Sequence, residues 1–264
     1  MMKKISNKLM RLMCLSRFTR FLGIKYVSIF RNRKSKLTSA KNTLNLLPKD
    51  NSILQELERS GFSSSFKIQD DLIDDIVSYA SQTTFVEQNG NKKFHIDYSN
   101  PIKPSDSIWY GNYNLLKENE SLQKIVYNKE ILDVCKKYFG VNPKLISSHM
   151  WWSFPPDNDE YTHQYGFHYD IDSFKFLKIF IYLNDVDLNT GPHVIIGGTH
   201  KRKSFKEKLN RRLTDAQVQN NKRYSDVNIM IGEKGTCFFE DTFCYHKGQS
   251  PKKPRLILQA EYSI

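Results

Sequence analysis

The residues best suited to chemistry in this sequence are His168 and Asp170, which stand two apart in the run 165–170. On a β-strand, side chains alternate between the two faces, so residues two apart point the same way. A strand here would therefore present an imidazole and a carboxylate side by side. His246, near the C-terminus, would complete a face of three metal ligands and leave other coordination positions open. His168, Asp170 and His246 are the candidate catalytic and metal-binding residues.

Two histidines and one carboxylate on one face are the ligand set of non-haem Fe(II) oxygenases. Arg255 follows His246 by nine residues, across a turn rich in Gly, Ser and Pro, so it can return beside that histidine. An arginine can hold a carboxylate through two parallel, charge-assisted hydrogen bonds. A second His-x-Asp, His95 with Asp97, precedes a polar, proline-containing stretch rather than a strand. We expect a surface or capping role for that pair.

The elements that must position these residues are strands in the C-terminal half of the chain. Strand-like patterns follow Pro143 at 145–154, around His168, and at 176–183, 194–196, 235–240, 242–246 and 256–262. Within 176–183, Ile179, Ile181 and Leu183 alternate with Lys178, Phe180 and Tyr182. One aliphatic and one mixed face is typical of a strand between a hydrophobic core and a cavity. We expect the mixed face to line the pocket.

The N-terminal half is predicted to be largely helical. Apolar residues spaced by three and four predict helix over 52–79, with an interruption near Gly61, and over 115–139. Residues 37–52 are typical of a linker, 85–108 of turns, and 201–223 of a basic insert with a short helix and a solvated face.

The domain organisation follows from these patterns. We expect an arm and linker at 1–45 and one domain at 46–264. Within that domain, 46–142 is mostly helical and 143–264 holds the β-core.

The net charge of +12 arises in the N-terminal arm. Twelve of the 40 Lys and Arg lie in residues 1–41, which contain no Asp or Glu, so 28 basic residues face 28 acidic ones in the rest. Three interpretations stay open: a helix packed on the body, a basic amphipathic helix on an anionic membrane, and nucleic-acid binding, which no recognition motif supports. No apolar run is long enough to span a membrane, and no clean signal-peptide cleavage site is present.

The four cysteines show no C-x-x-C spacing. This usage is typical of reduced thiols, and it predicts a cytoplasmic protein, with peripheral membrane contact through the arm left open.

Several stretches of residues 145–264 match one family in the right order. They are Phe167-His168-Tyr169-Asp170, Leu177 to Asp187 running into Gly191-Pro192-His193, Gly197-Gly198-Thr199-His200-Lys201, His246-Lys247-Gly248, and Arg255-Leu256-Ile257-Leu258-Gln259. Together they cover somewhat under half of the chain. This part resembles the phytanoyl-CoA dioxygenase-like branch of the Fe(II)/2-oxoglutarate oxygenases.

The resemblance implies a mainly β fold with flanking α-helices and a double-stranded β-helix core, which is a cupin-like jelly roll. It implies His168, Asp170 and His246 as ligands of Fe(II), with 2-oxoglutarate and O2 as co-substrates. Arg255 would anchor the distal carboxylate of 2-oxoglutarate. The implied reaction decarboxylates 2-oxoglutarate to succinate and CO2 and hydroxylates an unactivated C–H bond of a small or carrier-linked metabolite. Because Asp170 is intact, the halogenase variant, which replaces this carboxylate, is disfavoured.

The sequence departs from the family two residues after the distal histidine. A hydroxyl side chain there often helps to hold the co-substrate, but this chain has Gly248. Ser250 and Tyr182 are the candidate substitutes for co-substrate binding. Among the other histidines, we expect His200 to be structural, and for His193 a position at the mouth of the cavity stays open as the lesser alternative. His149 and His163 are assigned no role.

Two other classes of function stay open. One is a non-catalytic, metal-binding β-helix module at an anionic membrane. The other is a cupin-type metalloenzyme that needs no co-substrate, against which Arg255 argues, because such an enzyme has no use for a carboxylate anchor.

Overall fold

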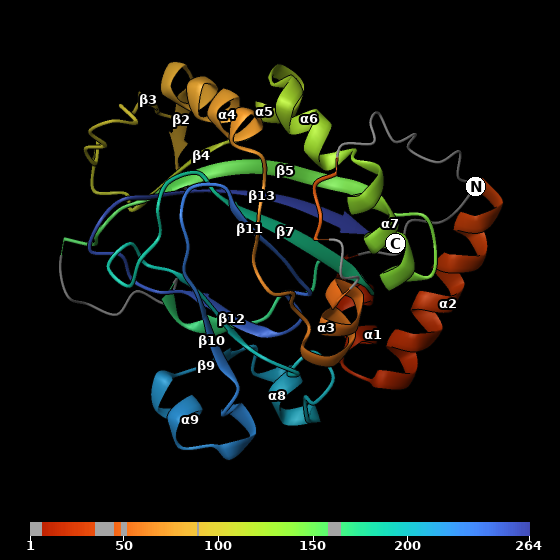
Figure 1. Ribbon diagram of the computed structural model, residues 1–264. Coiled ribbons are helices and arrows are strands. Elements are labelled where there is room, and N and C mark those ends of the chain that lie inside the picture. Colours follow the sequence, from red (N-terminus) through yellow and green to blue (C-terminus); the bar gives the residue numbers. More distant parts are fainter. Residues whose placement is uncertain (1–6, 35–44, 49–51, 89, 158–164) are drawn as a thin grey trace.

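The computed structural model describes residues 7–34, 45–48, 52–88, 90–157 and 165–264. Two antiparallel sheets lie face to face, and helices cover the outer side of the larger one (Figure 1). This is the mainly β fold with flanking helices and a jelly-roll core that the sequence analysis predicts. None of the helices in the described ranges is long and apolar enough to cross a membrane.

The larger sheet has eight strands. Their order is β1 (Phe66–Lys67), β11 (Thr236–Glu240), β7 (Phe176–Tyr182), β13 (Arg255–Ser263), β5 (Lys144–Ser153), β4 (Trp109–Asn112), β2 (Thr84–Glu87) and β3 (Lys93–His95). The smaller sheet has five, in the order β10 (Val227–Met230), β8 (His193–Ile196), β12 (Tyr245–Gly248), β6 (Phe167–His168) and β9 (Arg212–Leu213). Every pairing in both sheets is antiparallel.

Alternation along the long strands separates two hydrophobic cores. On β7, Ile179 and Ile181 join the large core that the helices cover, and Leu258 of β13 does the same. Phe180 of β7 and Ile257 of β13 point the other way, into a smaller core between the sheets. The small core covers only part of the inner face of the larger sheet, and the remaining positions of that face carry polar side chains that line a cavity.

The helical stretch predicted over 115–139 is confirmed, and it consists of three helices. They are α5 (Leu115–Glu118), α6 (Glu120–Val126) and α7 (Lys129–Phe139). Asn119 caps α6 by accepting a hydrogen bond from the Leu122 N–H, and Asn128 caps α7 by accepting from the Glu130 and Ile131 N–H groups. An asparagine side chain that satisfies the first N–H groups of a helix starts a new helix at that point. The predicted interruption near Gly61 is confirmed, since α3 (Ser52–Ser60) and α4 (Asp70–Gln82) are separate.

Residues 85–108 contain strands as well as the predicted turns, because β2 and β3 form a short hairpin there that pairs with β4. These strands are too short to show an alternating pattern in the sequence. They form because β4 pairs with β5 and β2 pairs with β4, which extends the larger sheet. Strand β12 starts later than the predicted 242–246, because Asp241 opens a turn in which its carbonyl and carboxylate accept from Cys244 and Phe243. Strand β10 has no counterpart in the sequence prediction. Its Val227 and Ile229 face solvent.

The described part of the basic arm forms α1 (Asn7–Cys14) and α2 (Arg17–Lys34), and one face of it packs on the body. Met10 and Cys14 are buried, and Arg20 Nε donates to the Phe174 carbonyl at 2.7 Å. The packed-helix interpretation therefore holds for this face. Residues 1–6 and 35–41 of the arm lie outside the described residues, as does most of the predicted linker.

Two further predictions concern the insert and the thiols. The basic insert 201–223 carries two short helices, α8 (Phe205–Leu209) and α9 (Asp215–Gln219), where one was predicted. All four cysteines are buried free thiols.

Candidate functional site

The predicted metal ligands come together between the two sheets. Strand β12 pairs with β6 so that His246 stands opposite His168, and their ring centroids are 4.5 Å apart. Asp170 follows β6, and its backbone N–H donates to the Thr242 carbonyl at 2.8 Å. One ligand atom from each of the three residues lies within 4.8 Å of the other two. The three side chains are close enough to share one metal ion.

The hydrogen bonds of the two imidazoles fix which nitrogen faces the site. Nδ1 of His168 donates to the Gly166 carbonyl at 2.9 Å, and Nδ1 of His246 donates to the Cys244 carbonyl at 3.1 Å. Both rings are therefore held as tautomers whose Nε2 lone pair is available to a metal, as in metal sites where the second ring nitrogen is bound to the protein. Nε2 of His246 lies 3.7 Å from the Asp170 carboxylate.

Lys178 of β7 holds the carboxylate of the site. Its Nζ contacts Asp170 Oδ2 at 2.8 Å and Asp172 Oδ2 at 2.9 Å. Burial disfavours the charged form of Asp170, but Lys178 and then His246 outweigh that effect and lower its pKa below the usual range. Burial likewise opposes the charge on Lys178, and Asp170 and Asp172 outweigh it and raise its pKa. Asp170 is thus an ionised, oriented metal donor.

Arg255 lies at the start of β13, in the same cavity, and is buried. Its Nη1 donates to the Gly191 carbonyl and its Nη2 lies 3.5 Å from Ser153 Oγ, while Nε has no hydrogen-bond partner among the described residues. Within the described ranges no carboxylate forms an ion pair with it, and burial lowers its pKa. A buried, unpaired guanidinium is costly, so this group is suited to an anionic ligand that enters the cavity.

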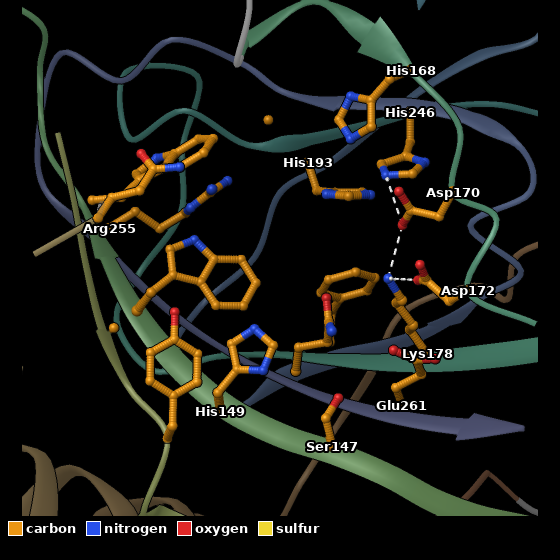
Figure 2. A pocket seen from close by; sticks show the side chains of 18 of the residues that line it. Ser147, His149, His168, Asp170, Asp172, Lys178, His193, His246, Arg255 and Glu261 are labelled. Carbon is orange, nitrogen blue, oxygen red and sulfur yellow. Dashed lines mark hydrogen bonds and ion pairs between the residues drawn. The ribbon is translucent and has the colours of Figure 1, made fainter. Parts of the chain in front are cut away.

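The cavity that joins these groups has a volume of about 440 Å³. In Figure 2, Arg255 lies at one side and His168, His246 and Asp170 lie at another, all directed into the same space. Lys178 and Phe180 line the cavity, as predicted for the mixed face of β7, but Tyr182 does not. Trp151 lines it while Trp152 belongs to the outer core, because neighbouring residues of a strand face opposite ways.

A polar wall lies across the cavity from Arg255 (Figure 2). Glu261 of β13 stands between Ser147 of β5 and Lys178 of β7 in the sheet register, so these side chains form one row. His149, next along β5 on the same face, and Asp172 also line the cavity. Burial raises the pKa of Glu261 to about 7, against the effect of Lys178.

The sequence analysis did not predict a role for Glu240, which is fully buried beside His193 and His246. Its Oε2 accepts from His193 Nε2 at 2.7 Å, and its Oε1 lies 3.5 Å from His246 Nδ1. Burial raises the pKa of Glu240 to about 7, while His246 acts in the opposite direction. A glutamate that ends the apolar run 237–239 was the available signal. His193 lines the cavity, where the sequence analysis left open a position at the mouth, and burial lowers its pKa well below the usual range.

The structure does not bring Tyr182 or Ser250 to the site as co-substrate ligands. The Tyr182 hydroxyl donates to the Met230 carbonyl at 2.7 Å and accepts from the His193 N–H, so it is used within the protein. Ser250 is exposed and lies at a separate surface pocket. Gly248, which replaces the expected hydroxyl residue, lies close to Arg255: a Cβ there would be 3.4 Å from Nη2. Ser153 is the hydroxyl residue that contacts Arg255 instead.

The second His-x-Asp has a surface role, as expected. Nε2 of His95 bonds to the Ser81 carbonyl at 2.8 Å, and Asp97 Oδ1 accepts from the Ser99 N–H and hydroxyl. Both side chains are exposed. His163 lies outside the described residues.

His200 is structural, as expected: it is buried, and its Nδ1 lies 3.5 Å from Cys244 Sγ. Burial lowers its pKa to about 4, below the ordinary 6.5. Between pH 6.5 and pH 4 the unfolded chain binds a proton at His200 that the folded protein does not bind. The free energy of unfolding is therefore highest above pH 6.5 and decreases as the pH falls toward 4.

His200→Gln should therefore reduce the acid sensitivity of the fold. We expect it to remove about 2 kcal/mol of the decrease in unfolding free energy between pH 7 and pH 5. Urea unfolding at the two pH values measures this, with His95→Gln at the surface as the control. Equal losses in wild type and His200→Gln would assign the acid sensitivity elsewhere.

Comparisons with known proteins add structural neighbours only. No family model matches the chain, and no curated protein matches it. HygX from Streptomyces hygroscopicus, solved with nickel and 2-oxoglutarate bound, has a TM-score of 0.55 at 12% identity over 82% of this chain and 87% of HygX. EctD from S. alaskensis, with bound Fe, has a TM-score of 0.55 at 14% identity over 86% of this chain and 80% of EctD. The non-haem α-ketoglutarate-dependent epimerase SnoN from nogalamycin biosynthesis has a TM-score of 0.53 at 12% identity, over 80% and 79%. At these identities the likeness shows a shared fold.

Proposed function

We propose that this protein is an Fe(II)- and 2-oxoglutarate-dependent oxygenase. The observation that carries the proposal is that one cavity holds both the His168–Asp170–His246 cluster and a buried arginine without a carboxylate partner in the described structure. A metalloenzyme without a co-substrate would have no use for that buried cation. The hypothesis of a cupin-type metalloenzyme that needs no co-substrate is therefore the weaker one.

The residues of the site divide the work between them. His168, Asp170 and His246 would hold Fe(II), whose chemistry when bound is the activation of O2. Lys178 keeps Asp170 ionised and oriented, and the backbone carbonyls of Gly166 and Cys244 hold the imidazole tautomers. Arg255 would bind the distal carboxylate of 2-oxoglutarate and direct its keto-acid end toward the metal. Phe180 and Trp151 restrict water on the apolar side of the cavity.

The structural neighbours support this class. HygX was solved with nickel and 2-oxoglutarate bound, and EctD was solved with bound Fe. SnoN is an α-ketoglutarate-dependent epimerase. The reaction that we propose here is hydroxylation of an unactivated C–H bond, with conversion of 2-oxoglutarate to succinate and CO2. It rests on the motif resemblance to the phytanoyl-CoA dioxygenase-like branch.

Anaerobic titration of the apoprotein with Fe(II) and then 2-oxoglutarate tests the proposal. A weak visible charge-transfer band that appears only when both are present supports chelation of the co-substrate by the bound metal. Folded, iron-loaded protein that gives no band with 2-oxoglutarate would contradict it.

The polar wall favours a small polar substrate over a long acyl chain. Glu261 and Ser147 face the space that remains beside the metal, as does Asp172 in its ion pair with Lys178, and an acyl chain there would offer these polar groups no hydrogen bond. We therefore expect succinate release to be stimulated by compounds that carry hydroxyl or amino groups, and not by fatty acyl-CoA esters. A screen of both classes under identical conditions checks this, and stimulation by acyl-CoA alone would refute it.

A further inference from the structure

Helix α2 is apolar on the side that faces away from the body. Phe18, Phe21, Leu22, Lys25 and Ile29 recur at spacings of three and four, which places them on one face of a helix. The four apolar members are 68%, 52%, 45% and 54% exposed, respectively. Helix α1 adds Leu12, which is 55% exposed, next to the exposed Arg11. We call Leu12, Phe18, Phe21, Leu22, Lys25 and Ile29 the outer stripe.

The outer stripe is not the face that holds the arm to the protein. The other side of α2 carries Gly23, against which the Phe174 ring packs, and Ile24 and Val27, which pack on the large core. Arg20 fixes this side through its hydrogen bond to Phe174 and its position 3.8 Å above the Phe243 ring. The fold therefore presents the outer stripe on an anchored helix pair at one edge of the molecule (Figure 1).

A stripe of this kind differs from ordinary surface exposure. Single exposed apolar residues need no explanation, but adjacent ones mark surfaces that bind something. The positive charge of the arm indicates an anionic binding partner for the outer stripe. Residues 1–41 carry twelve Lys and Arg and no acidic residue, whereas the rest of the chain is balanced.

We propose that the outer stripe docks on the surface of an anionic lipid bilayer, with Phe18, Phe21, Leu22 and Ile29 entering the interface. Basic residues beside a bulky apolar face are the combination that holds a helix in the plane of such a membrane. Nucleic acid would use the charge but not the stripe. A second copy of this chain would bring like charges together across the contact, which anionic headgroups instead neutralise.

Co-sedimentation of the full chain with vesicles tests this proposal. The protein should bind vesicles of phosphatidylcholine with phosphatidylserine, bind phosphatidylcholine alone much less, and lose affinity as salt is raised. The triple variant Phe18→Ser, Phe21→Ser, Ile29→Ser should bind about tenfold or more weakly. The matched control Ile102→Ser, Leu188→Ser, at positions 70% and 58% exposed outside the arm, should bind as wild type.

A second variant isolates the charge, and unchanged near-UV circular dichroism checks folding throughout. Lys8→Glu, Arg11→Glu, Lys25→Glu keeps the five apolar side chains of the outer stripe and should also weaken binding. The proposal is overturned if wild type ignores anionic vesicles, or if the stripe and control variants bind alike. It is equally overturned if wild type is a dimer in light scattering that only the stripe variant dissociates. The proposed enzyme activity does not enter any of these measurements.

Discussion

Alanine at His168 should abolish the visible band that Fe(II) and 2-oxoglutarate form together and should weaken Fe(II) binding by about a hundredfold or more. Among the residues that the structure describes, the cluster offers three protein ligands, so loss of one imidazole leaves a histidine and a carboxylate, which cannot define a face. His168 is the better of the two histidines to replace, because it is half-buried at the end of a two-residue strand, whereas His246 is buried against Glu240. Anaerobic Fe(II) titration with visible absorbance measures the effect.

The sequence supplies its own control for this experiment. His95 also precedes an aspartate by two residues, but its side chain is exposed and bonded to the Ser81 carbonyl. His95→Ala should keep the band and the Fe(II) affinity of wild type. If His95→Ala lost the band and His168→Ala kept it, the assignment of the metal pair would be reversed.

Arg255→Met should raise the KM for 2-oxoglutarate by about 30-fold to several thousand-fold while leaving Fe(II) affinity nearly unchanged. Truncating one partner of a buried, hydrogen-bonded charge pair costs about 2–5 kcal/mol. Methionine keeps much of the volume of arginine, so lost packing contributes little. Arg255→Lys keeps the charge but not the two parallel donors, and it should lie between wild type and Arg255→Met.

Thermal unfolding separates binding of the co-substrate from a structural role of Arg255. The buried guanidinium lacks a carboxylate partner in the described structure, so Arg255→Met should not lower the Tm of the apoprotein. When 2-oxoglutarate is added to the metal-loaded protein, it should raise the Tm of wild type further but should raise that of the variant much less. Arg202→Met, at an exposed position, serves as the control. Comparable losses of Fe(II) and 2-oxoglutarate binding, or a collapse of the apoprotein, would argue against a carboxylate anchor.

The sequence by itself determined the residues that depend on local periodicity. His168 and Asp170 share a face because a strand alternates, and the same alternation sends Lys178 and Phe180 into the cavity and Ile179 and Ile181 into the core. The resemblance carried the rest of the constellation, since it tied His246 and Arg255 to that strand across many intervening residues. The fold class followed from the same motifs.

The tertiary structure decided what depends on register and burial. Glu240 and Glu261 matter because antiparallel pairing sets each of them opposite Lys178, from strands far apart in the sequence. Tyr182 shares the inner face of β7 but is taken up by the Met230 carbonyl, which alternation alone could not reveal. Helix α2 shows the same limit, because its periodicity is apolar on two sides and only packing selects the side that is covered. The pairing of strands that lie far apart in the sequence is set by the whole fold and not by any one segment.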